Sequence, residues 1–386
     1  MIECRLITFH LIIIELESVM DRLMLEIYSD FLISSFGQTS TTVLSRLLDN
    51  SISHDQITRF LEQGVNVSRS LWLLAKPLVR HIEHEDGVVS IDDCVQPKPH
   101  SRENGVIEWH YDHSVGAVVK GINFITAFYG VPAAGQTEER YGVPVSCEVI
   151  VKKPVWDAKK QTTVMKSPIS KQELYRELLK NCKANGIKYK YVLNDTWFTN
   201  AENMNFINEI LKKKFVMAIK ENMIATICDA EDIIVWRGPI RELPSIECQV
   251  CQVYLSGIDF PVWVTRHVFK NKDGSTGTMY LCTNDQDLDA DQTLSVYQKR
   301  WPIEEFHKSL KQNVSLAKCP ASRPGVQIKH MLCSLYGYVK LEWMKLAQSG
   351  NHFSIRSGMY LAALKSSYAE LQAMRTKISQ SGFVIA

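Results

Sequence analysis

Hydrophobic residues recur at the spacing of an α-helix through residues 20–85, and this pattern predicts a helical N-terminal region. Within it, a first short helix ends at the polar run Asp49–Ser51, and a second begins at Ser53 or His54. The second helix carries its apolar side chains on one face: Ile57, Phe60 and Leu61. Two short helices around a polar break fit a helix-turn-helix that enters a DNA groove. A helical hairpin packed into a core fits the same pattern at least as well.

From Gly87 onward, runs of apolar and β-branched residues replace the helical spacing, which is typical of strands covered on both faces. Three strands are expected first, at Gly87–Val95, Ile122–Tyr129 and Val143–Val151. An amphipathic helix over Ser170–Ala184 follows, opened by a capping box of Ser170 and Glu173. After it we expect a strand at Tyr189–Leu193, a helix at about 200–213 and a strand at Phe215–Ile219. This order predicts an α/β core with a mixed sheet.

Residues 221–289 are rich in strand-forming residues and turns, so we expect a β-rich insertion within the core rather than a continuation of it. Helical patterning returns near Asp291 and continues to about residue 348. The chain is therefore expected to have five parts: a helical N-terminal region over 1–85, the first part of the core over 86–220, the β-rich insertion over 221–289, the completion of the core over 290–348, and a helical tail over 349–386.

Composition alone leaves the function open. The 386 residues are 45% hydrophobic and 22% charged, which is ordinary for a globular protein with a large core. A formal net charge of +2 excludes a histone-like polycation and an acidic tail protein. The charge is uneven, however, because residues 141–220 contain 15 Lys+Arg against 7 Asp+Glu, a local net charge of +8. A basic segment of this kind is compatible with a nucleic-acid-binding face.

Cysteine usage and the first residues indicate a soluble protein of a reducing compartment. The ten cysteines lack the dense spacing of a secreted disulfide scaffold. Cys248 and Cys251 form a single CxxC without a second ligand pair nearby, so strand thiols are favoured over a zinc site. The apolar run Leu6–Ile14 is too short to span a membrane, and no cleavage site accompanies it. It is interpreted as a buried helix or as an appendage ahead of a second start at Met20.

Acidic residues follow two of the predicted strands. Asp92–Asp93 ends the first strand, Asp195 ends the fourth, and Glu304–Glu305 lies on the helix after the insertion. Ligands of open α/β sheets gather at the carboxyl ends of strands, so the aspartates there can converge. Carboxylates suit hard divalent cations, and two such ions support phosphoryl transfer. Taken singly, each acid also fits a helix cap or a solvated surface position.

The helix around Glu304 carries a distinctive stripe. In the segment YQKRWPIEEFHKSLK (297–311), five side chains recur at steps of three and four: Tyr297, Arg300, Glu304, Lys308 and Lys311. Pro302 predicts a kink or a fresh helix start within the segment. The stripe offers one carboxylate among cations that can hold DNA phosphates. A surface helix in which Glu304 pairs with Lys308 is the alternative.

The stripe resembles the YREK signature of bacterial insertion-sequence transposases of the IS-four group, fulfilled here by Tyr297, Arg300, Glu304 and Lys311. The segments SIDDCVQPK (90–98) and VLNDTWFTNAENM (192–204) resemble the first-aspartate strand and second-aspartate segment of that group. A closely related insertion-sequence family that shares the IDD motif is the other candidate. The resemblance covers about residues 20–348 and implies a DDE active site on an RNase H-like fold, a mixed sheet with helices on both faces. It also implies that residues 221–289 form an insertion domain.

The resemblance implies a role for each matching residue. Asp93, Asp195 and Glu304 would be the catalytic metal ligands, holding two Mg²⁺ ions for which Mn²⁺ can substitute. Asp93 is preferred to Asp92 because the ligand in that group directly precedes a residue that is usually Thr, although Cys94 stands here. DNA contacts would come from Tyr297, Arg300, Lys308 and Lys311, whereas Trp301 is expected to pack. The segment WHYDHS (109–114) is interpreted as a polar loop in preference to a second metal site.

The implied function is a DNA transposase that cuts insertion-sequence ends and joins them to target DNA. Its partners would be double-stranded DNA, at inverted-repeat ends and at the target, and a second copy of the chain in the DNA complex. The N-terminal helices over 1–85 are the candidate for binding DNA ends, and the protein would act in the bacterial cytoplasm on the nucleoid, without a membrane. Two alternatives remain: an inactive transposase-derived DNA-binding protein, and an RNase H-like nuclease with another nucleic-acid substrate.

Overall fold

The computed structural model describes residues 19–113, 115–131, 141–244, 250–271, 273–348 and 350–380. The apolar run Leu6–Ile14 and Cys248 of the CxxC pair lie outside these ranges, so neither interpretation can be compared with the structure. The chain divides into two compact units. The sheet unit contains residues 64–307 and 322–324, and the helical unit contains the residues before 64, residues 308–321 and those from 325 onward.

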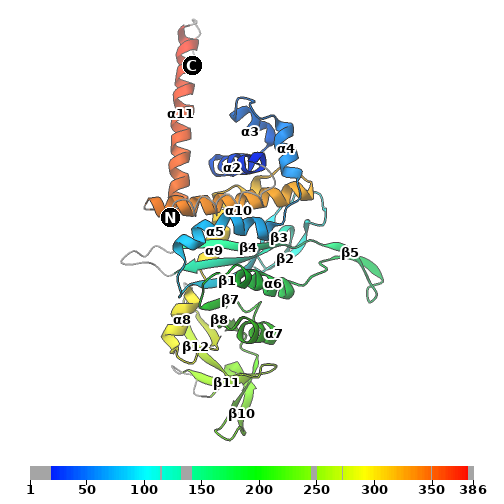
Figure 1. Ribbon diagram of the computed structural model, residues 1–386, viewed down its shortest axis with the longest axis vertical. Coiled ribbons are helices and arrows are strands. Elements are labelled where there is room, and N and C mark those ends of the chain that lie inside the picture. The colour runs from blue at the N-terminus through cyan, green and yellow to red at the C-terminus, as the bar shows by residue number, and fades with distance from the viewer. Residues whose placement is uncertain are drawn as a thin grey trace, which may run out of the picture. The chain divides into compact units, whose positions relative to one another are not determined.

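An eleven-stranded sheet forms the centre of the sheet unit, and its strands are coloured from cyan to yellow in Figure 1. The strands are β1 (Val88–Pro97), β2 (Ile107–Asp112), β3 (Ala117–Val131), β4 (Tyr141–Val149), β7 (Tyr191–Asn194), β8 (Lys214–Ile219), β9 (Ile224–Cys228), β10 (Ile234–Pro239), β11 (Cys251–Leu255), β12 (Val262–Lys270) and β13 (Thr276–Thr283). A separate hairpin is formed by β5 (Lys153–Asp157) and β6 (Thr162–Lys166). The helices are α5 (Val67–Ile82), α6 (Lys171–Ala184), α7 (Ala201–Asn205) with a π-helical turn over Phe206–Leu211, α8 (Ala290–Gln298) and α9 (Pro302–Gln312), which continues into the helical unit.

Five strands form the middle of the sheet, in the order β4-β3-β1-β7-β8. Strand β3 is antiparallel to β1 and β4, whereas β7 is parallel to β1 and to β8. Strand β2 pairs along the remaining part of β3. The strands at 88–97, 117–131, 141–149, 191–194 and 214–219 confirm the five strands expected from the sequence, and α6 confirms the helix with its Ser170–Glu173 capping box.

The β-rich stretch does not interrupt the sheet. Its strands β9 to β13 confirm the expected strand content, but β13 pairs antiparallel with the core strand β8, with Leu281 opposite Ala218. Within the described residues, this stretch therefore extends the same sheet through the pairing of β13 with β8. The physical reason is that β8 would otherwise expose an unpaired edge, and β13 satisfies its backbone groups. Leu281 also packs into the same buried cluster as Leu193 and Val216.

Two elements were not expected from the sequence. Strand β2 includes Trp109–Asp112 of the WHYDHS segment, so this part is a strand rather than the polar loop that we expected. Ser114, the last residue of the segment, lies outside the described residues. Its alternation of buried and exposed side chains is short and carries charged and aromatic residues, which hides the strand period. The β5–β6 hairpin is almost entirely exposed, so no apolar pattern marks it.

The helical unit contains α2 (Val19–Ser34), α3 (Thr41–Leu47), α4 (His54–Glu62), α10 (Pro324–Ala347) and α11 (His352–Gln380). The break between α3 and α4 confirms the expected polar turn, in which Asp49 and Asn50 adopt left-handed conformations with φ of 51° and 61°. Ser53 caps α4 as expected, and the apolar face of α4 is buried. Helices α2 and α10 are joined by a hydrogen bond of 3.0 Å between Tyr28 Oη and His330 Nδ1. No helix within the described ranges is long and apolar enough to cross a membrane.

Candidate functional site

Two aspartates meet at the carboxyl ends of the parallel strands β1 and β7. Ser90 lies opposite Leu193 in the β1–β7 register, so the same register two residues further on places Asp92 level with Asp195. Burial, followed by repulsion from Asp195 and Asp93, raises the pKa of Asp92 from 3.8 to about 7. Burial also raises the pKa of Asp195. The sequence therefore predicted this convergence of acids correctly, and the pair carries more negative charge than its buried surroundings favour.

Helix α9 brings a third acid to this pair, and the turn before the helix brings an arginine. The Arg300 Nη1 atom lies 3.9 Å from Asp92 Oδ2, and Arg300 Nη2 donates to Glu304 Oε1 at 2.5 Å. His307 Nδ1 lies 4.0 Å from Asp92 Oδ2. Arg300 thus connects the carboxylate of Asp92 to that of Glu304, one turn further along the chain. Its Nε atom is buried and has no partner among the described residues, which leaves one donor for a further acceptor.

The local sequence explains how α9 presents Glu304. Pro302 begins the helix, as expected for a residue that cannot donate in a helix interior. Ile303 and Phe306 are fully buried, and the Phe306 ring lies 5.0 Å from that of Phe128 on β3. These apolar anchors hold one side of α9 against the sheet. The Glu304 side chain, 53% exposed, remains on the accessible side.

Asp93, the aspartate preferred from the sequence, points elsewhere. Successive residues of a strand point to opposite faces of the sheet, so Asp92 and Asp93 have different neighbours, although the charge of Asp93 contributes to the raised pKa of both Asp92 and Asp195. The Asp93 carboxylate accepts from Lys171 Nζ of α6 at 2.7 Å, while Asp92 faces Arg300 and His307. The structure therefore groups Asp92, and not Asp93, with the side chains of α9.

The other residues of the stripe separate into two groups. Tyr297 and Arg300 lie together, with the guanidinium 5.6 Å from the centre of the tyrosine ring. Burial raises the pKa of Tyr297, which keeps its hydroxyl protonated. Lys308 and Lys311 follow Glu304 on α9 but belong to the helical unit, where Lys308 Nζ lies 5.0 Å from the Phe353 ring centre. They continue the stripe along the helix without a described contact to the acids.

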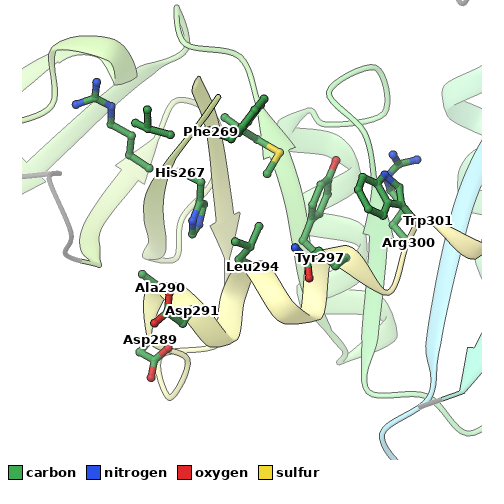
Figure 2. Close-up of a pocket in the computed structure, with 13 residues that line it drawn as sticks. His267, Phe269, Asp289, Ala290, Asp291, Leu294, Tyr297, Arg300 and Trp301 are labelled. Carbon is green, nitrogen blue, oxygen red and sulfur yellow. The ribbon is translucent and has the colours of Figure 1, made fainter. Parts of the chain in front are cut away.

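A pocket of about 1070 Å³ opens beside Tyr297 and Arg300. Figure 2 shows these two side chains at one end of the pocket together with Trp301, and His267 on β12 further along. Trp301 is 60% exposed, so the expectation that it is a packing residue is wrong. Pro302 starts a new helix directly after it, and the tryptophan is therefore not carried into the buried face of α9.

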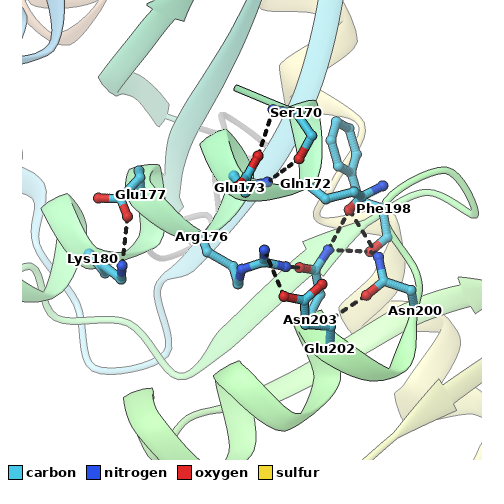
Figure 3. A network of polar contacts seen from close by, with 10 residues as sticks. All are labelled: Ser170, Gln172, Glu173, Arg176, Glu177, Lys180, Phe198, Asn200, Glu202 and Asn203. Atoms are coloured by element: carbon cyan, nitrogen blue, oxygen red, sulfur yellow. Dashed lines mark hydrogen bonds and ion pairs between the residues drawn. The ribbon is translucent and has the colours of Figure 1, made fainter. Parts of the chain in front are cut away.

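A polar network holds the loop that follows Asp195. Trp197 N donates to Asp195 Oδ1 at 3.0 Å, which orients the carboxylate. Gln172 of α6 donates to the Trp197 carbonyl at 3.0 Å, and its own Oε1 accepts from Asn200 and Asn203 at 2.9 and 2.7 Å. Figure 3 shows Gln172 between α6 and this loop. The network fixes the position of Asp195 through the backbone rather than through strand pairing.

Some residues of the site were missed from the sequence. Lys171 and Gln172 begin α6 and contact groups far along the chain, so no local spacing marks them. His307 lies three residues after Glu304 on the same helix, and this spacing is a signal that could have identified it.

The donor chemistry of the acids fits a divalent cation. Hard cations take carboxylate oxygens, and a cation next to Asp92 and Asp195 would offset the repulsion that raises the pKa of Asp92. In the ranges that the structure describes, no three His, Cys, Asp or Glu side chains are already grouped as a metal site. The ion pair with Arg300 accounts for this at Glu304, because its carboxylate is engaged by the guanidinium.

When the sequence is compared with models of known protein families, one family model matches it. A family model described as "DDE superfamily endonuclease" matches residues 16–232, which include Asp92, Asp93 and Asp195 and end before Glu304. A search of the curated proteins found no match.

Proposed function

Since this chain belongs to the DDE superfamily endonucleases, whose family model matches more than half of it, we propose that it is a DNA transposase of the YREK type. It would cut the ends of an insertion sequence and join them to target DNA in the bacterial cytoplasm. The strand order β4-β3-β1-β7-β8, with β3 antiparallel to its neighbours, supports an RNase H-like core. The β-rich strands β9 to β13 would then be the family's insertion, attached at the edge of the core sheet.

The observation that carries this proposal is the pair of half-buried aspartates, Asp92 and Asp195, beside the Arg300–Glu304 ion pair. We assign the three acids as Asp92, Asp195 and Glu304. The sequence-based preference for Asp93 gives way to Asp92 because only Asp92 faces Arg300. These carboxylates would hold two Mg²⁺ ions, or Mn²⁺, which would activate the attacking oxygen and stabilise the leaving oxygen of a phosphodiester.

The surrounding side chains would bind and orient the DNA. Arg300 can leave Glu304 for a phosphate, to which its unpartnered Nε and its Nη atoms present a planar fork. The protonated hydroxyl of Tyr297 can donate to a second phosphate oxygen. Lys308 and Lys311 would extend this contact along the strand, and the Lys-rich segment 141–220 would add affinity that falls steeply with salt.

The reaction sequence would begin with water cutting the element end and freeing a 3′-hydroxyl. That hydroxyl would then attack a further phosphodiester, and the YREK stripe supports a route through a DNA hairpin at the cut end. Sequencing gels that show only open double-strand ends at all times would exclude the hairpin. Strand transfer into target DNA would follow by the same chemistry.

The deciding experiment is Mg²⁺-dependent cleavage of a labelled duplex that carries the inverted repeats flanking the coding region. Asp92→Asn, Asp195→Asn and Glu304→Gln should reduce cleavage to the level without enzyme while end binding remains. Asp93→Asn should retain cleavage, and it is the matched control because it removes the neighbouring carboxylate.

Three results would overturn these assignments. Loss of cleavage in Asp93→Asn together with full activity in Asp92→Asn would restore the sequence-based choice. A wild-type protein that binds ends and never nicks them would favour an inactive, transposase-derived DNA-binding protein. Cleavage of other nucleic acids without preference for inverted repeats would favour an RNase H-like nuclease.

We also propose that the chain acts as a homodimer on DNA, with α11 as the contact. Five exposed apolar side chains and one arginine follow a heptad spacing along it: Leu361, Leu364, Tyr368, Leu371, Arg375 and Ile378. A stripe of this spacing buries itself by pairing with a second helix. Replacing Leu364 and Leu371 by Asp should shift the DNA complex from two copies to one in light scattering. An unchanged mass would remove α11 from the interface.

A further inference from the structure

A second pocket, of about 580 Å³, lies on the other face of β1 from Asp92. It is lined by residues of β2, β3 and the start of α6, by residues on either side of the β5–β6 hairpin, and by Trp197 after Asp195. Three of its residues, His110, Tyr111 and His113, come from the 109–114 segment that the catalytic assignment leaves unused. The antiparallel register places Val95 opposite Asn123 and His110 opposite Val119. Because alternate residues of a strand share a face, His110, Asn123 and Asp93 lie on the same side of the sheet.

Two of the lining side chains are buried polar groups without partners. Asn123 is 1% exposed, and neither its Oδ1 nor its Nδ2 atom has a hydrogen-bond partner among the described residues. His110 is 5% exposed, and its Nε2 atom likewise has no hydrogen-bond partner among the described residues. Burial, with smaller contributions from Lys152 and Lys171, lowers the pKa of His110 to about 3 and keeps the imidazole neutral. Leaving such groups unpaired is costly, which indicates that a ligand with both donors and acceptors completes them.

The rim of this pocket is aromatic. Trp197 is 43% exposed, and its ring centre lies 4.6 Å from that of His113, which in turn lies 4.8 Å from that of Tyr111. Gln172 donates a hydrogen bond of 3.0 Å to the Trp197 carbonyl, which holds the backbone of this residue in place. An exposed aromatic side chain on a fixed loop is suited to stacking a flat ring.

Cations complete the lining. Lys152, Lys166 and Lys171 all line the pocket, and Asp93 holds Lys171 in place through its ion pair of 2.7 Å. The acid in the lining, Glu173, is engaged in the capping box, where it accepts from Ser170 N at 2.7 Å. The pocket therefore offers positive charge, a stacking surface and paired donor and acceptor groups, which are the features that bind one nucleotide.

We propose that this pocket binds a single unpaired nucleotide of the DNA strand, with its base stacked against Trp197, its edge bonded to Asn123 and His110, and its phosphate held by the lysines. The inference rests on the proposed function for its choice of DNA as the ligand.

The test is a comparison of two DNA duplexes of equal sequence, one fully paired and one with a single unpaired nucleotide. Their affinities are measured by fluorescence anisotropy in EDTA at fixed salt, so that no cleavage occurs. Stacking of one base on an aromatic side chain contributes about 1–3 kcal/mol, which predicts at least about fivefold tighter binding of the bulged duplex by the wild type. Trp197→Ala should lose this preference. Trp156→Ala removes another exposed tryptophan, on the β5–β6 hairpin outside the pocket, and should keep it.

Further variants separate binding from folding. Lys166 is exposed, so Lys166→Ala should weaken binding of the bulged duplex without affecting the fold, whereas Asn123→Leu should remove the preference and leave the structure intact by circular dichroism. Equal affinity of the wild type for both duplexes, or an unchanged preference in Trp197→Ala, would refute the pocket. If the protein binds the bulged duplex more tightly in EDTA but never cuts DNA with Mg²⁺, only the catalytic proposal is refuted. If it cuts DNA but binds both duplexes equally, only the nucleotide pocket is refuted.

Discussion

Replacing Asp92 by Asn should make the metal-free protein more stable at alkaline pH while removing its proposed catalytic acid. Burial and the neighbouring aspartates raise the pKa of Asp92 to about 7 in the folded state, against an ordinary value of 3.8. The folded state therefore binds a proton more tightly than the unfolded state. A raised pKa contributes stability that is present below the unfolded value and is lost as the pH rises through the folded value.

The size of the effect follows from that shift. About three pKa units correspond to ~4 kcal/mol of stability below pH 4, at about 1.4 kcal/mol for each unit. Because protonation is linked to folding, about 3 kcal/mol of this stabilisation remains at pH 5 and almost none at pH 8. The side chain of Asp92 is 19% exposed, so solvent screening makes these figures upper bounds.

The assay is urea unfolding in EDTA at pH 5 and pH 8, followed by tryptophan fluorescence. The wild type should lose stability between the two pH values, and Asp92→Asn should lose markedly less. Asp93→Asn removes a smaller source of the repulsion together with the Lys171 ion pair, so it should lose less of the pH dependence than Asp92→Asn does. Mg²⁺ at pH 8 should raise the midpoint of the wild type and leave that of Asp92→Asn nearly unchanged. An identical pH dependence in the wild type and in Asp92→Asn would refute the argument from charge repulsion.

Three other predictions concern the elements that position the site. Phe306→Ala removes a fully buried anchor of α9 and should cost about 3–5 kcal/mol in urea unfolding; a cost below about 1 kcal/mol would show that α9 does not depend on it. Ser170→Ala removes the cap of α6 and should cost about 1 kcal/mol, whereas the exposed Thr163→Ala on β6 should cost little. Arg300→Lys keeps the positive charge but loses the planar guanidinium fork, so DNA cleavage should fall much more than binding of the DNA ends. An equal loss of cleavage and of end binding would contradict a role of Arg300 at the cut phosphate.

The strands and helices of the core were largely predictable because their signals are local. The capping box at Ser170 and the turn after α3 depend on neighbouring residues, and both are present as expected. The convergence of Asp92 and Asp195 also followed from the sequence, since the ends of parallel strands meet at one edge. The β5–β6 hairpin was missed because an exposed hairpin carries no pattern of buried positions.

What only the tertiary structure decided is which neighbour each acid has. Asp92 and Asp93 are neighbours in the sequence, and what separates them is which side chains reach each face of β1: Arg300 and His307 on one side, and Lys171 of α6 on the other. The attachment of β13 to β8 likewise depends on an edge formed by residues some 60 positions earlier. The sequence by itself determined the kinds of element and the presence of an acidic, DNA-directed stripe. The structure decided the pairing of charges, because contacts between distant segments leave no periodic signal along the chain.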